Sequence, residues 1–166
     1  MTPLLFALAL AAQTSDSVRQ SRYERVLNSA NDSLGRLRGV IAVFRTDLPS
    51  ASRELVLVRA ERVRAMCHGA DAAVIEVQSL LAEGLYSRRA EREQSQLQKG
   101  SIEMRRVFAR CAREWETPDP PVAAAADSLQ AWGPYRTAQL EAAVRRFAEQ
   151  LRHFMNKTGL KTPLPR

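Results

Sequence analysis

Four side chains could carry redox or metal chemistry: the two cysteines, Cys67 and Cys111, and the two histidines, His68 and His153. The cysteines are too far apart in the sequence to form a CxxC redox motif. A di-iron site in a helical bundle needs a glutamate three positions before each histidine, because that spacing puts both ligands on one helix face. Neither histidine has such a glutamate, so this class of metal site is excluded.

Two other ligand sets stay open as hypotheses. A haem or metal could be held by Met66 or His68 together with His153, or by both cysteines and both histidines, if the helices bring these residues together. The spacing supports neither set specifically, because isolated histidines on a helical protein are more often surface residues. We therefore expect no metal and no cofactor.

Motifs of the common enzyme classes are missing from the sequence. The glycines stand alone, so there is no phosphate-binding loop and no dinucleotide fingerprint, both of which need clustered glycines. No GxSxG elbow occurs. The carboxylates alternate with arginines in the way expected of a solvated helical surface. We expect a protein that is not an enzyme.

The basic residues are the most prominent surface feature. The chain has 25 Lys and Arg against 18 Asp and Glu, a formal net charge of +7, and such a surface favours encounters with anions. No aromatic residues interleave with the arginines in a stacking pattern, which makes nucleic acid an unexpected partner. The alternative is an ordinary solvated surface, partly neutralised by nearby glutamates. The candidate anion-binding face consists of Arg59, Arg62, Arg105, Arg106, Arg110 and Arg113, and a second basic region consists of Arg145, Arg146, Arg152, Lys157 and Lys161.

The elements that position these residues are helices. The length of 166 residues and the hydrophobic fraction of 45% suit one domain with a real core. From Tyr23 to Leu48 the apolar residues step alternately by four and three, which is a heptad pattern, and similar steps recur downstream. Short connections between long helices predict an all-α, antiparallel up-down-up-down four-helix bundle. The predicted helices cover about 16–48, 52–85, 88–116 and 120–155, inside a bundle domain 13–156 that is followed by a flexible tail, 157–166.

Two details of this arrangement stay open to alternatives. Gly133–Pro134 is expected to kink or break the fourth helix, since proline removes a backbone donor and clashes with the preceding turn. The apolar stripe of the first helix is narrower than most bundle faces, so an elongated homodimer that pairs through this helix is the second architecture to consider.

The cysteines fix a register for the second and third helices. The midpoint of Cys67 and Cys111 is residue 89, next to a reversal predicted independently from the turn residues, so residue i should face residue 178 − i. The third-helix seam consists of Leu97, Ser101, Met104, Phe108, Cys111 and Trp115. Under this rule it maps only onto apolar residues of the second helix: Leu81, Val77, Val74, Ala70, Cys67 and Val63. Matched cysteines on adjacent helices can reach disulfide distance. We predict a structural Cys67–Cys111 disulfide; the alternative is a pair of buried thiols in a reducing compartment.

The first residues resemble an export signal. Residues 1–12 carry no charged side chain, Leu4–Ala12 is entirely apolar, and Ala9-Leu10-Ala11 gives the small-x-small pattern that a signal peptidase reads. We predict a secretory signal peptide over 1–12, cleaved after Ala11 or Ala12, and a periplasmic or secreted protein. No Lys or Arg precedes the apolar run, so the alternative is a first turn packed on the core. No apolar run approaches the roughly 18 residues of a transmembrane helix.

These observations predict a secreted or periplasmic helical-bundle module that works by binding an anionic or protein partner and is not catalytic. The alternative function is a periplasmic chaperone-like or stress-binding protein that shields apolar clients. A salt titration distinguishes the two, because anion binding weakens with ionic strength whereas apolar binding does not.

Overall fold

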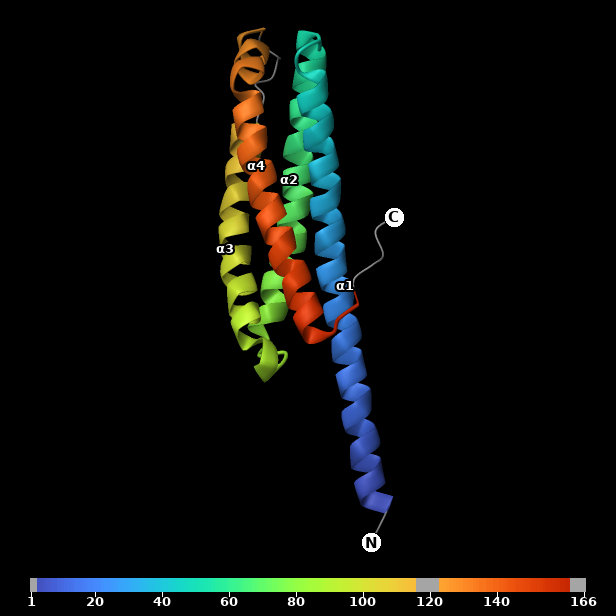
Figure 1. Ribbon diagram of the computed structural model, residues 1–166. Helices are drawn as coiled ribbons and strands as arrows, with labels where there is room; N and C mark the ends of the chain where they lie inside the picture. Colours follow the sequence, from blue (N-terminus) through green and yellow to red (C-terminus); the bar gives the residue numbers. More distant parts are fainter. Residues whose placement is uncertain (1–2, 116–122, 162–166) are drawn as a thin grey trace.

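The computed structural model describes the backbone of residues 3–115 and 123–161 and the side chains of 16–115 and 126–161. The helices pack side by side and alternate in direction (Figure 1). No strand occurs in the described ranges, and the predicted all-α four-helix bundle is confirmed. The elements are α1 (Pro3–Asp47), α2 (Arg53–Ala82), the short 3₁₀ turn η1 (Arg88–Ala90), α3 (Glu91–Glu114) and α4 (Ala123–Thr158).

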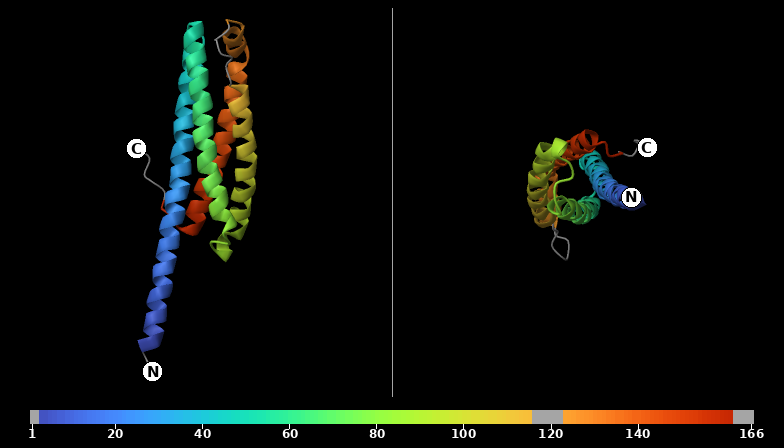
Figure 2. Two further views of the ribbon diagram at one scale, coloured as in Figure 1. Left: turned by 180° about the vertical axis from the view of Figure 1, so that it is seen from behind. Right: turned by 90° about the horizontal axis from the view of Figure 1, so that it is seen from below.

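The four helices form a square in cross-section (Figure 2, right). Each helix contacts its neighbour in the sequence, and α4 returns to contact α1. α1 and α3 therefore occupy opposite corners, while α2 and α4 also meet across the middle. This arrangement creates separate outer grooves, one between α1 and α2 and another between α3 and α4.

The core is built from the predicted heptad seams. On α1, every seam residue from Tyr23 to Leu48 is at most 5% exposed, and Trp115 at the end of the α3 seam is 1% exposed. On α2, Met66 is only half-buried because it lies at the edge that faces α1. The α1 seam is covered by the chain's own helices, and the homodimer through this helix stays a prediction.

The α2–α3 hairpin has the predicted register. Cys67 and Cys111 form a disulfide with a Cα–Cα separation of 6.3 Å. Gln94 of α3 donates a hydrogen bond to the carbonyl oxygen of Gly84 at 2.8 Å, and its own amide oxygen accepts one from the Tyr86 N–H at 2.8 Å. Both the cysteine pair and the pair of Gln94 with Gly84 follow the expected rule that residue i faces residue 178 − i.

Polar caps set the helix boundaries near their predicted places. The Ser52 hydroxyl accepts from the N–H of Leu55 at 3.3 Å and caps the start of α2, next to the predicted start at residue 52. α2 ends at Ala82 rather than 85. The Ser87 hydroxyl accepts from the N–H of Arg89 at 3.3 Å and opens η1, so the third helical segment begins with a 3₁₀ turn.

α4 continues through Gly133 and Pro134, so the expected break is wrong, while a kink at this point stays a prediction. Gly133 has no Cβ, which removes part of the clash between a proline ring and the residue before it. A Cβ at this position would lie 3.1 Å from Cε1 of Phe44, so the glycine also lets α4 approach α1 closely. The Thr137 hydroxyl donates to the Gly133 carbonyl oxygen at 2.8 Å. This hydrogen bond stabilises the helical turn that contains the proline.

Residues 157–161, which were predicted to belong to a flexible tail, form the end of α4 and the turn after it and pack against the bundle. α4 ends at Thr158, and Gly159 has a φ of 72°, in the left-handed region that favours glycine. The N–H of Leu160 bonds to the carbonyl oxygen of Met155 at 2.9 Å, which closes a Schellman motif and buries the Leu160 side chain. The main chain of Lys161 also forms hydrogen bonds with α1. The predicted tail thus differs over 157–161, and the rest of it lies outside the described residues.

The N-terminal part of α1 projects past the ends of the other helices (Figure 1). The side chains from Asp16 to Arg22 are all exposed, and Tyr23 is the first buried residue of the described part of α1. The segment predicted as a signal peptide forms the start of this helix, and its cleavage stays a prediction. In the part of the chain with described side chains, we find no helix with the length and apolarity needed to cross a membrane.

The buried Tyr23 phenol gives the protein an alkaline limit of stability. Burial raises the pKa of Tyr23 above its usual 10.0, although the neighbouring Arg19 acts in the opposite direction. The hydroxyl, which is buried, donates to the carbonyl oxygen of Leu80 at 3.3 Å, and a phenolate could not donate. Because the folded-state pKa is the higher one, this stabilisation is complete below about pH 10 and is lost as the pH rises through the folded pKa.

When the pH is raised from neutral to above 10, we therefore expect the free energy of unfolding to fall less in Tyr23→Phe than in the parent protein. Urea denaturation followed by circular dichroism at neutral and alkaline pH measures this difference. Tyr135→Phe is the control, because Tyr135 is 67% exposed. An equal alkaline loss in the parent protein and in Tyr23→Phe would contradict the assignment.

Candidate functional site

The structure divides the predicted anion-binding face between different grooves. Arg59 and Arg62 line a hollow between α1 and α2, whereas Arg110 lines a hollow between α3 and α4. Arg105 forms an ion pair with Asp71 of α2 at 3.5 Å. The remaining members of the face, Arg106 and Arg113, are exposed on α3 and line neither hollow. Anion binding by these residues stays a prediction, and the geometry directs it to two separate places.

The α1–α2 hollow combines an apolar floor with a basic rim. It has a volume of about 400 Å³. The helix spacing explains the set, since residues three or four apart lie on one face. The floor consists of Gly39, Val40, Val43 and Met66, and the rim consists of Arg36, Arg59 and Arg62.

One rim arginine of this hollow is anchored. An Arg59 NH2 nitrogen lies 2.9 Å from an Asp47 carboxylate oxygen. The Nε atom of Arg59 is buried and has no hydrogen-bond partner within the described part of the chain, and buried donors of this kind are uncommon in proteins. Arg36 and Arg62 have no carboxylate partner among the described residues, although Arg36 donates to the Ser33 hydroxyl at 3.2 Å. The rim therefore keeps a positive charge of about two.

Apolar side chains extend this surface along α2. Leu55 is 37% exposed and lies one turn before Arg59, and Val58 is 64% exposed and lies one turn before Arg62. The i, i+4 spacing places both on the outer side of α2. Val43 of the hollow floor is itself 44% exposed. The basic hollow and these residues together form an amphipathic strip.

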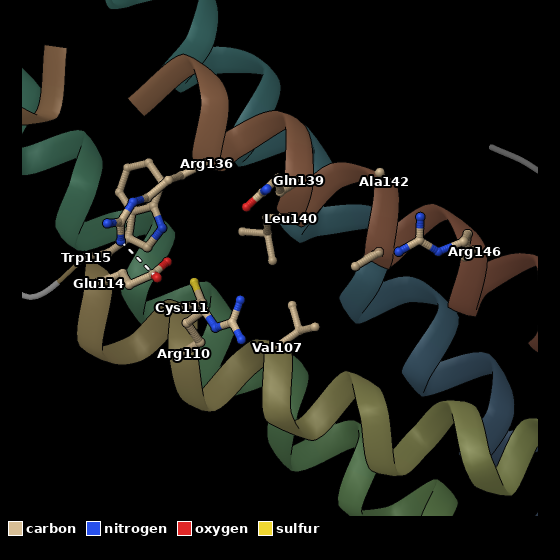
Figure 3. A pocket seen from close by; sticks show the side chains of 11 residues that line it. Val107, Arg110, Cys111, Glu114, Trp115, Arg136, Gln139, Leu140, Ala142 and Arg146 are labelled. Atoms are coloured by element: carbon tan, nitrogen blue, oxygen red, sulfur yellow. Dashed lines mark ion pairs between the residues drawn. The ribbon is translucent and has the colours of Figure 1, made fainter. Parts of the chain in front are cut away.

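The α3–α4 hollow has a similar make-up (Figure 3). It has a volume of about 330 Å³, and its apolar floor includes Val107, Cys111 of the disulfide, Trp115 and Leu140. Its charged lining residues are Arg110 and Glu114 from α3 and Arg136 and Arg146 from α4.

Arg136 is fixed from two sides. It pairs with Glu114 at 2.9 Å, and its guanidinium carbon lies 4.2 Å from the centre of the Trp132 ring, within cation–π distance. Arg110 and Arg146 have no acidic partner in the described part of the chain. In each hollow, then, one arginine is neutralised and two are available.

The set of both cysteines and both histidines does not form a metal site. The cysteines are bonded to each other and so offer no thiolate to a metal. His68 is exposed on α2, and His153 is exposed on α4 with its Nε2 atom 3.9 Å from a carboxylate oxygen of Glu93. In the described ranges, no group of three or more His, Cys, Asp or Glu is placed to hold a metal ion.

Several residues that line the two hollows were not predicted from the sequence. Val40 and Val43 are apolar residues outside the α1 heptad seam. Because the seam alone accounts for the buried apolar face of the helix, these two valines could have been recognised in the sequence as candidates for an apolar surface patch. The positions of Arg36 and Arg136 could not be predicted in this way. The apolar pattern identifies the buried face of a helix, but it does not indicate which groove an exposed arginine lines.

The fold and its surface define a four-helix bundle with two arginine-rimmed hollows. No family model, curated protein or solved structure matches the chain.

Proposed function

We propose that this chain is an exported, non-catalytic binding module that docks an acidic amphipathic helix of a partner protein in the α1–α2 groove. The observation that carries the proposal is the α1–α2 hollow, where the available guanidinium groups of Arg36 and Arg62 stand beside an apolar floor. Carboxylates of a partner would pair with the arginines, and its apolar side chains would cover the floor.

Charge complementarity selects this occupant over a second copy of the chain. A symmetric dimer through the groove would place Arg36, Arg59 and Arg62 of one copy against the same arginines of the other, since a two-fold interface pairs identical patches. Like charges at close range disfavour that contact. The carboxylates of an acidic segment would instead attract these arginines.

The shape of the groove favours a helix. Its lining residues run from Arg36 to Val43 on α1 and from Arg59 to Met66 on α2, which corresponds to about 10 Å, or two helical turns. Leu55 and Val58 add exposed apolar surface at one end. A helix that presents apolar residues at i, i+3 or i+4, and i+7 matches such a groove.

A synthetic peptide tests this binding mode. The probe is an acidic helical peptide of about 15 residues, with leucines along one face and glutamates on both flanks. We expect the full-length protein to bind it, and the Arg36→Gln/Arg62→Gln variant to bind at least about tenfold more weakly because two charge-assisted hydrogen bonds are lost. Isothermal titration calorimetry at several salt concentrations measures the affinity, which should fall as salt rises.

The control is Arg106→Gln/Arg113→Gln, which removes the same charge from exposed positions that line neither hollow. Equal weakening by both variants would overturn the groove and indicate general attraction to a basic surface. Salt-independent binding, or equal binding of a peptide with lysines in place of the glutamates, would overturn the acidic partner and favour the chaperone-like alternative, in which apolar clients are shielded.

Export is supported by the sequence of residues 1–12 and by the disulfide. A disulfide persists in oxidising compartments and is rare in the cytosol, which agrees with a periplasmic or secreted location. Expression of the whole chain in a bacterial host, followed by intact-mass measurement, tests the proposal. Loss of residues 1–11 or 1–12 is the expected result, and retention of Met1 together with Leu4–Ala12 would overturn it.

A further inference from the structure

The α3–α4 hollow is separate from the proposed docking groove and has its own combination of charge and apolar surface. It lies on the other side of the square of helices, since α1 and α3 occupy opposite corners. Its volume of about 330 Å³ falls in the lower part of the range of small-molecule sites. A small molecule suits a hollow of this volume.

The lining carries a net positive charge. Among the described residues, Glu114 is the only acidic one that lines the hollow, and Arg136 already neutralises it at 2.9 Å. Arg110 and Arg146 contribute two further positive charges and have no acidic partner among the residues that the structure describes. The formal charge of the hollow is therefore about +2.

The ion pair of Arg136 and Glu114 lines one part of the hollow, and the remaining arginines can bind a ligand. Arg136 is held between Glu114 and the ring of Trp132, so its guanidinium is not free to turn toward a ligand. In Figure 3 the guanidinium of Arg110 lies between the two helices, and the side chain of Arg146 extends along α4 toward Ala142. Both reach the hollow from exposed positions.

The apolar floor restricts the class of ligand. Val107, Ala142 and Ala143 are half-buried and present hydrocarbon surface to the hollow, whereas Cys111, Trp115 and Leu140 line it with at most 5% of their surface exposed. An inorganic anion would satisfy the arginines but leave this floor in water. A neutral apolar molecule would cover the floor but desolvate unpaired guanidinium groups, which is costly.

We infer that the α3–α4 hollow is a second binding site, for a small organic anion whose carboxylate or phosphate pairs with Arg110 or with Arg146, which line different parts of the hollow (Figure 3), while an aryl or short alkyl group packs on the floor. This goes beyond the proposed function, because it concerns another groove and another class of ligand. Guanidinium groups suit both anions, since they pair with carboxylate and phosphate oxygens through charge-assisted hydrogen bonds.

Phenyl phosphate is the probe for this site. We expect it to bind the full-length protein and to change the tryptophan fluorescence, because Trp115 lines the hollow and Trp132, the other tryptophan of the chain, packs against Arg136 of the lining. The double variant Arg110→Gln/Arg146→Gln should weaken binding at least about tenfold, as expected for loss of a hydrogen bond between charged groups. Titration calorimetry gives the affinities, and both substitutions are at exposed positions, so the fold is retained.

The control variant is Arg36→Gln/Arg62→Gln, which alters the other hollow and should bind phenyl phosphate unchanged. An equal loss in this variant, or inorganic phosphate binding as tightly as phenyl phosphate, would overturn the site. Vesicles of phosphatidylglycerol distinguish a lipid headgroup from a free anion, and binding to vesicles without binding of phenyl phosphate would also overturn it. The acidic peptide tests the α1–α2 groove independently, so failure of one proposal leaves the other standing.

Discussion

Replacing Trp115 with alanine is expected to lower the free energy of unfolding by about 3–5 kcal/mol, the usual cost of removing a large aromatic side chain from a core. Trp115 is 1% exposed and closes the end of α3. Its ring lies 4.9 Å from that of Phe44 of α1 and 5.4 Å from that of Trp132 of α4, in both cases edge to face. The substitution would remove contacts to two other helices at once and leave a cavity between them.

Urea denaturation followed by circular dichroism measures this loss. Trp115→Phe should lose much less, because it keeps an aromatic ring in the same place. Trp132→Ala should also lose less, since Trp132 is only half-buried. A loss below about 1 kcal/mol for Trp115→Ala, the size expected of a surface substitution, would show that the ring is not enclosed by the three helices.

Removing the disulfide is expected to lower the free energy of unfolding by up to about 4 kcal/mol. The cysteines are 44 residues apart in the sequence, and a crosslink of that span restricts the unfolded chain by about this amount on the chain-entropy model. Both positions are buried, so the double variant Cys67→Ala/Cys111→Ala is preferable to serine, which would bury unpaired hydroxyls.

Reductant provides the matched comparison for this prediction. The parent protein should lose stability in the presence of a thiol reductant and approach the stability of the double alanine variant. The double variant itself should not respond. A parent protein whose unfolding is insensitive to complete reduction, verified by thiol alkylation and intact mass, would contradict a stabilising role for the bond.

The fold was largely predictable because strict heptad spacing leaves few other ways to bury the seams. The seam from Tyr23 to Leu48 fixed the buried face of α1, and the position of the cysteines fixed how α2 pairs with α3. The errors arose where tertiary contacts override local tendencies. Gly133–Pro134 is accommodated inside α4 because Phe44 packs against the glycine, and the end of α4 is ordered because Leu160 returns to the core.

The candidate site was much less predictable. Charged side chains on exposed positions obey no periodicity, so the sequence could group Arg59 with Arg110 as one face. The structure separates them because the hairpin of α2 and α3 directs its outer residues toward different neighbours, α1 in one case and α4 in the other. This separation depends on how the helices are ordered around the square, which no short spacing encodes.

The end of α4 is fastened to α1 through the main chain of Lys161. Its N–H donates to a carboxylate oxygen of Glu24 at 3.0 Å, and its carbonyl oxygen accepts from the side-chain amide of Asn28 at 3.1 Å. The last helix thereby ends beside the first, and chains with adjacent ends often tolerate circular permutation. A short linker from Lys161 to the start of the packed part of α1 would let the chain be opened at the exposed turn 49–50 instead. Every helix would keep its present neighbours, so the order of the four helices along the chain is separable from the architecture that they build.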